Sequence, residues 1–148
     1  MINIQITKML NFPKNWIPSF SPRATYCFDV EENGRNNHVL ITTHQIKRQD
    51  RLINMQFAYH AMSQQVKEEK YHMVEENVKV QIMQTPTGLG YYFMATDSEW
   101  VPSSSDWPYL VRCMFVGQQT AIELTVLCFN HESIVIQQAF DLLNNPCI

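Results

Sequence analysis

The residues in this chain of 148 that could do chemistry are five histidines, four cysteines and a run of three serines. The histidines are widely separated, and no two neighbours have the spacing of a metal site. His60 follows Tyr59 in a stretch with helical periodicity. A lone, exposed histidine on a helix is more often a neutral surface residue than a catalytic residue. The five positions are His38, His44, His60, His72 and His131.

The cysteines and serines give no stronger signal for catalysis. The cysteines lie at positions 27, 113, 128 and 147 and form no Cys-x-x-Cys pair. Cys113 and Cys128 fall in apolar stretches, so we predict small buried hydrophobes rather than nucleophiles, metal ligands or redox groups. Ser103, Ser104 and Ser105 precede no helix start that could build an oxyanion hole. Because phosphate loops and hydrolase motifs are also absent, we predict no catalytic residues, no metal and no cofactor.

One connection between predicted strands holds more aromatic and acidic residues than a turn requires. Two tryptophans lie there beside three carboxylates, and aromatic anchors within a polar rim are typical of a protein interface. The alternative is that both indoles fold back on the core. The acids favour a basic partner, such as the cleft of a toxin that acts on anionic substrates. The predicted partner-binding residues are Asp97, Glu99, Trp100, Asp106 and Trp107.

Length and charge limit the class of protein. The chain is 45% hydrophobic and carries a net charge of −3 with no basic stripe, which argues against a nucleic-acid partner. No apolar run approaches the roughly 20 residues that a membrane-spanning helix needs. We predict one domain, residues 1–148, that is a monomer or weak homodimer. The start lacks the pattern of a secretory signal, which favours the cytoplasm, or the periplasm if a signal was removed.

The hydrophobic periodicity predicts the elements that position these residues. Alternation indicates strands at 2–6 and 25–30, a polar turn at 31–34, and a partner strand at 38–46. The turn-rich segment 12–18 has two prolines, and we expect Phe12 and Trp16 to plug one end of the core. The period then changes to that of a helix, with Asp50 as its N-cap. Its expected inner face is Leu52, Met55, Tyr59, Met62 and Val66.

The second half of the chain reads as strands followed by a helix. Alternation predicts a strand over 78–83, a turn over 85–90, a strand over 91–97, and a hairpin formed by 109–116 and 120–129. Asn130 is the expected cap of the last helix, whose inner face is predicted to be Ile136, Ala139, Phe140 and Leu143. Short reversals between strands favour an α+β fold, an antiparallel sheet flanked by two main helices.

The pattern resembles the PsbP/DcrB-like family of small domains with a central antiparallel sheet. The likeness rests on residues 12–16, which look like the family's Pro-x-x-Trp entry, on 90–93 with Thr96 and Asp97, and on 116–124 leading into the last helix. The resemblance implies binding rather than catalysis, because the family has no shared catalytic residues. Its members include adaptors, lipoproteins, photosystem subunits, and chaperones and immunity-like proteins of type VI secretion.

Four functions follow as hypotheses. The sequence departs from the effector-chaperone pattern by lacking an acidic residue soon after Trp16, which favours an immunity protein that occludes a cognate secreted toxin. A type VI effector chaperone would need an exposed apolar groove, for which Met55, Met62 and Met83 are available. A periplasmic lipoprotein-like adaptor is the other binding alternative. An enzyme or small-ligand binder would instead need a pocket with His60 or His131 as titrating group.

Overall fold

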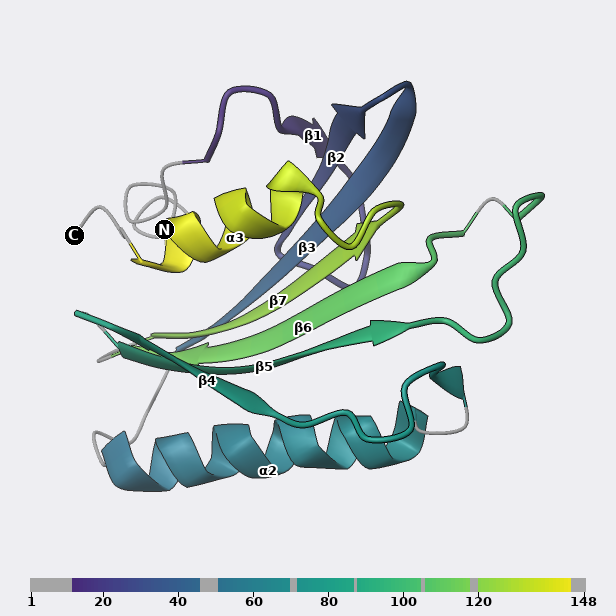
Figure 1. The fold of residues 1–148 in the computed structure, drawn as a ribbon. Helices are drawn as coiled ribbons and strands as arrows, with labels where there is room; N and C mark the ends of the chain where they lie inside the picture. The colour runs from purple at the N-terminus through teal and green to yellow at the C-terminus, as the bar shows by residue number, and fades with distance from the viewer. Residues whose placement is uncertain are drawn as a thin grey trace.

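The computed structural model describes residues 12–45, 51–69, 72–86, 88–104, 106–117 and 120–144, and the side chains of 51–53 fall outside the description. Within these residues, one antiparallel sheet of seven strands has a helix on each face (Figure 1), which confirms the predicted α+β class. The elements are β1 (Ile17–Ser19), β2 (Tyr26–Glu32), β3 (Arg35–Gln45), α2 (Arg51–Glu69), β4 (Gln81–Thr85), β5 (Gly88–Thr96), β6 (Tyr109–Val116), β7 (Thr120–Cys128) and α3 (Ile134–Asn144).

The strand order is β1-β2-β3-β7-β6-β5-β4, so two meanders meet at the β3–β7 pair. Helix α2 takes the chain from β3, in the middle of the sheet, to β4 at its edge. The β2–β3 turn is Asn33–Gly34, with φ of 54° and 78°. Left-handed conformations at both central residues match the right-handed twist of a hairpin, and Asn-Gly supplies them at low steric cost. Glu31 and Glu32, predicted as part of the turn, therefore belong to β2.

The core on the α3 side joins all the central strands. Alternate residues of β2, β3, β6 and β7 pack beneath Val135, Ala139 and Leu143 of α3. Trp16 is 3% exposed in this cluster, with Phe12 against it, so the predicted plug is confirmed. The indole of Trp16 donates to Gln138 Oε1 of α3 at 3.0 Å, which ties the N-terminal segment to the helix.

The core on the α2 side is smaller because α2 packs on β5 and β6. Ala58 and Met62 of the helix meet Tyr91 and Phe93 of β5, and Met55 and Val66 pack around them. Of the predicted inner face, Tyr59 instead lies at the flank of α2, 46% exposed, with its ring edge-on to Tyr91. Asp50 and the side chain of Leu52 lie outside the described residues, as does the predicted strand 2–6.

Other predictions are corrected by tertiary contacts. Residues 17–19 form edge strand β1 although Pro18 lies within it, which is tolerated because an edge strand leaves one side unpaired. The strand predicted at 78–83 is shifted to Gln81–Thr85. The last helix begins at Ile134 rather than directly after Asn130. Its first amides are capped by Glu32, which accepts from Ile134 N at 3.3 Å, and by Ser133, which accepts from Val135 N.

Candidate functional site

The loop between β5 and β6, which holds the predicted partner-binding residues, is fixed at its base. Asp97 N donates to Pro108 O at 2.8 Å, and Ser98 N donates to His72 O at 2.9 Å. The Asp97 carboxylate accepts from Glu99 N at 2.9 Å, which forms an Asx turn. The loop is therefore presented from a rigid root beside the segment that follows α2.

Both loop tryptophans are engaged within the molecule. Trp100 Nε1 donates to Asp106 O at 2.8 Å and closes the loop on itself. Trp107 Nε1 donates to Asn36 O at 2.7 Å, and its ring stacks on His38 with centroids 5.4 Å apart. Trp100 thus closes its own loop and Trp107 lies on strand β3, and neither indole enters a core cluster. Whether their remaining faces contact a partner stays a prediction.

The three loop carboxylates point to solvent. Asp97, Glu99 and Asp106 are all exposed, and the one ion pair among them joins Glu99 to His72 at 3.7 Å. Every ion pair among the described residues is formed by a histidine, and none by lysine or arginine. The loop therefore presents acidic groups that a basic partner could neutralise.

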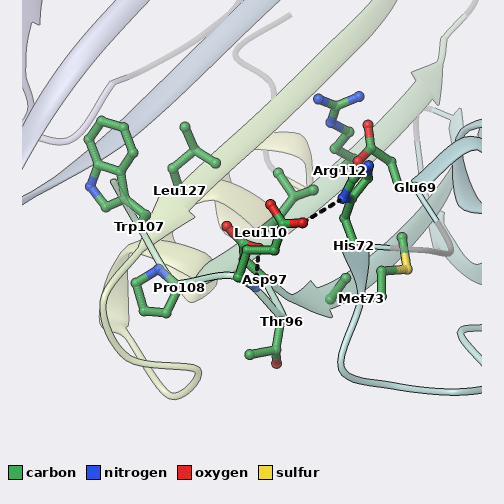
Figure 2. Close-up of a pocket in the computed structure, with 12 residues that line it drawn as sticks. Glu69, His72, Met73, Thr96, Asp97, Trp107, Pro108, Leu110, Arg112 and Leu127 are labelled. Carbon is green, nitrogen blue, oxygen red and sulfur yellow. Dashed lines mark hydrogen bonds and ion pairs between the residues drawn. The ribbon is translucent and has the colours of Figure 1, made fainter. Parts of the chain in front are cut away.

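A cavity of about 310 Å³ lies between the end of α2 and this loop. Figure 2 shows Arg112 and Glu69 at one end of it and Trp107 with Pro108 at the other. Leu110 and Leu127 contribute apolar walls, and Asp97 and Glu99 contribute carboxylates. The cavity combines an aromatic wall, aliphatic surface and acidic groups.

Arg112 reaches this cavity from β6 beneath α2. Its guanidinium donates to Gln65 Oε1 at 3.0 Å, and its buried Nε has no hydrogen-bond partner within the described residues. Arg112 therefore links β6 to α2, and its hydrogen-bond donors are only partly satisfied.

Helix α2 packs on one face of the sheet over β5 and β6. On the same face, no described helix lies over β7, β3 and β2, and we call that part the open face. Its residues alternate with the α3-side core and are half-buried or exposed apart from Cys27. His44 of β3 pairs with Glu123 of β7 at 3.0 Å. The open face comprises Cys27, Asp29, Glu31, His38, Leu40, Thr42, His44, Ala121, Glu123, Thr125 and Leu127.

Cys27, His38 and Asp29 lie together on this open face, a cluster that the sequence did not predict. His38 Nδ1 lies 2.9 Å from Asp29 Oδ1, and His38 Nε2 lies 3.2 Å from Cys27 Sγ. The Asn33–Gly34 turn could have revealed it, because a two-residue hairpin turn places Asp29 opposite His38. The Cys27 sulfur also lies 4.0 Å from His38 Nδ1, so it packs over the imidazole ring. No group of three or more metal ligands occurs among the described residues.

The described cysteines differ in their surroundings. Burial raises the pKa of the Cys113 thiol to about 12 and that of Cys128 to about 11, as expected for the buried hydrophobes predicted at these positions. Burial also raises the pKa of Cys27, and the charge of Asp29 adds to it, while a hydrogen bond with Ser19 opposes the rise. Cys147 lies outside the described residues.

The other residues considered for chemistry remain apart. His60 and His131 are exposed on different sides of the molecule, with His60 against Tyr59 and His131 against Tyr109. Met62 is buried, and Met55 and Met83 pack against the core. These methionines therefore do not form the exposed groove that the effector-chaperone hypothesis requires.

The base of the loop includes a carboxylate whose effect on stability depends on pH. Glu75 accepts from Thr96 N at 2.9 Å and from Thr96 Oγ1 at 2.5 Å. Burial alone would raise the Glu75 pKa, but these hydrogen bonds outweigh burial and lower the pKa from its ordinary value. The folded state thus favours the ionised form, a stabilisation present above the unfolded pKa and lost as pH falls through the folded pKa.

We expect Glu75→Gln to cost about 1 kcal/mol of unfolding free energy at pH 7, with the difference from wild type shrinking as pH falls below about 4. Urea denaturation across this pH range measures the effect. The exposed neighbour provides the control Glu76→Gln, for which we expect no such pH-dependent difference. A constant difference between wild type and Glu75→Gln down to low pH would contradict this assignment.

Comparison with known proteins supports the fold. A scan against protein-family models finds no match, and a search of curated proteins finds none. Among solved structures, the fold is similar to the crystal structure of LpqN, involved in cell envelope biogenesis of Mycobacterium tuberculosis. The TM-score is 0.52 at 10% identity, over 91% of this chain and 78% of that one. None of the described helices is long and apolar enough to cross a membrane.

Proposed function

We propose that the chain is a non-enzymatic adaptor that binds another protein through the open face and the β5–β6 loop. The observation that carries this proposal is the combination of a sheet face over which no described helix lies with acidic groups that no described lysine or arginine pairs with. A basic segment of the partner would meet Asp97, Glu99 and Asp106, and one lysine or arginine side chain would enter the cavity beside Trp107.

The fold likeness favours an adaptor of the cell envelope among the binding functions. LpqN is involved in cell envelope biogenesis, and a PsbP/DcrB-like identity is compatible with the helix-covered antiparallel sheet. On this proposal the chain acts in the periplasm or at the envelope. The acidic loop favours a second candidate, a cytoplasmic immunity protein that occludes a toxin, because many toxins bind anionic substrates in basic clefts.

The acidic surface can be tested by charge reversal with a matched control. The triple variant Asp97→Lys, Glu99→Lys, Asp106→Lys changes exposed side chains and leaves the backbone–backbone hydrogen bonds of the loop in place. It removes the Asp97 Asx contact and the ion pair of Glu99 with His72. The control, Glu68→Lys, Glu132→Lys, Asp141→Lys, makes the same charge change on exposed residues of α2 and the α3 side. Circular dichroism of both variants checks that the fold is kept.

We expect the loop variant to bind its partner roughly 10- to 100-fold more weakly than wild type, and the control to bind within about threefold. The partner is first captured from native cells with tagged wild-type protein, and its affinity for each variant is then measured by calorimetry at two salt concentrations. Equal affinities for all three proteins would remove the loop from the interface.

The identity of the captured partner separates the two candidate functions. An envelope protein supports the adaptor. A toxin whose lethality is relieved by co-expression of this chain establishes the immunity function instead. A partner bound with unchanged affinity by the loop variant would show that the chain binds through another surface.

A further inference from the structure

The outer edge of β5, the side away from β6, is paired near both ends of the strand. Near its start, Tyr92 pairs with Gln81 of β4. At its end, Thr96 O accepts from Val74 N at 2.9 Å, and Thr96 N donates to the Glu75 carboxylate at 2.9 Å. Both backbone groups of Thr96 therefore point to this outer edge.

Met94 lies between these two contacts, and no described residue pairs with its backbone on the outer edge. Successive residues of an antiparallel strand direct their backbone groups to opposite sides, so the N–H and C=O of Met94 point the same way as those of Thr96. The segment that joins the two contacts turns to the α2 side, where Val78 and Val80 pack on the core. Met94 therefore presents a donor and an acceptor that a further strand could use.

A cavity of about 310 Å³ lies beside Met94 on the α3 side of the sheet, and we call it the α3-side cavity. Its lining includes Val111 of β6 and Ile136 of α3, which are both buried, and the side chain of Met94, which is 36% exposed. Tyr109 and His131, with ring centroids 5.5 Å apart, also line it, and no lysine or arginine does. The volume is at the lower end of the range for ligand sites and suits one large side chain.

A strand added at this edge would direct one side chain into the α3-side cavity. A residue that pairs with Met94 has its side chain on the same face of the sheet as the Met94 side chain. That face is the α3 side, because Met94 lies opposite Val111 of the core beneath α3. The carboxylate in the lining, that of Glu75, already accepts from Thr96, so an uncharged apolar side chain fits this cavity best.

We propose that β5 binds an extended peptide through the backbone of Met94, with a large apolar side chain of the peptide in the α3-side cavity. One residue of the peptide donates its N–H to Met94 O and accepts from Met94 N, as in strand addition at a sheet edge. Backbone pairing supplies affinity, and the cavity supplies the preference for one residue type. The site lies on the opposite face of the sheet from the open face, so it does not depend on the interface proposed above.

The test measures binding of the capped tripeptide Thr-Phe-Thr by NMR, from the amide chemical shifts of the wild-type protein. We expect a Kd of about 1 mM or lower, with the largest shifts at Met94, Ala95 and Val111. The peptide with alanine in place of phenylalanine is expected to bind roughly tenfold or more weakly, because it leaves the cavity unfilled.

N-methylation of the peptide tests the backbone pairing. A methyl group on the phenylalanine nitrogen removes the N–H that pairs with Met94 O, and we expect about tenfold weaker binding. The matched control carries the methyl group on the preceding threonine nitrogen, which points away from β5, and should bind within about threefold of the parent peptide.

A pair of protein variants tests the position of the site. Met94→Glu places a charge beside the apolar cavity and is expected to weaken binding at least about tenfold. Val74→Glu makes the same charge change at a residue that is 60% exposed and does not line the cavity, and should bind within about threefold of wild type. If Met94→Glu does not fold, the two N-methylated peptides decide with wild-type protein.

Four results would overturn the proposal. They are no binding of the phenylalanine peptide, equal binding of the alanine peptide, equal effects of the two N-methyl groups, and shifts centred on the open face instead of on Met94.

Discussion

Replacing Asn37 with alanine is expected to lower the free energy of unfolding by about 3 kcal/mol, because it breaks a buried polar network. Asn37 is 1% exposed. Its amide nitrogen donates to Glu32 Oε1 at 3.2 Å and to Ser133 Oγ at 3.4 Å, and its amide oxygen accepts from Phe129 N at 3.1 Å. Alanine would leave these groups without the partner they have in the interior.

The Asn37 network also fixes the start of α3. Ser133 Oγ donates to Glu32 Oε1 at 2.8 Å, and the same carboxylate accepts from Ile134 N. We therefore expect Asn37→Ala to increase hydrogen exchange in the first turn of α3 as well as to shift the urea midpoint. Asn36→Ala is the matched control, since Asn36 is an exposed neighbour whose contact with Trp107 uses its backbone oxygen. A loss of less than about 1 kcal/mol would show that the network is not what holds α3.

The second large effect is expected at Gly88, at the start of β5. A Cβ there would lie 2.3 Å from the backbone oxygen of Val116 and 2.6 Å from Phe115 Cζ. A backbone oxygen in a paired strand does not move away at low cost, so β5 and β6 must separate locally. We expect Gly88→Ala to cost about 3 kcal/mol, the upper end of the range for an overpacked interior.

Gly90→Ala provides a control in the same strand, two residues away. Its Cβ would meet the flexible end of Met83 at 3.1 Å and Cys113 Sγ at 3.3 Å. The side chains can shift by a few tenths of an ångström, and the loss of chain entropy in the unfolded state opposes the strain. We expect a change within about 1 kcal/mol in denaturant unfolding. Similar losses for the two variants would show that the clash at Val116 is relieved without separating the strands.

The elements of the fold were largely predictable because hydrophobic periodicity is a local property. The hairpin of β6 and β7, the helix after residue 50 and the plug by Trp16 follow from which residues must be buried. The cap of α3 was only partly predictable in this way. Ser133 is a local cap that lies close to the predicted Asn130, whereas Glu32 reaches Ile134 across 102 positions of the sequence.

The candidate site was predictable in its residue types but not in their roles. The sequence identified the loop that holds Trp100, Trp107 and the carboxylates. It left open where the indoles point, because the partner of Trp107 is a backbone oxygen 71 residues away. The pairing of His38 with Asp29 was accessible through the Asn33–Gly34 turn, whereas the contact of Trp107 with His38 depends on how the two meanders of the sheet join.

The sequence by itself thus determined the α+β class, the acidic and aromatic character of the β5–β6 loop and the burial of Cys113 and Cys128, because each depends on composition and alternation. Only the tertiary structure decided which half of one sheet face has no described helix over it, and that Cys27 lies beside a histidine that contacts a carboxylate. Both depend on strand order and on α2 packing over β5 and β6 rather than over β3 and β7. Strand order is set by contacts between distant segments, which a pattern along the chain does not contain.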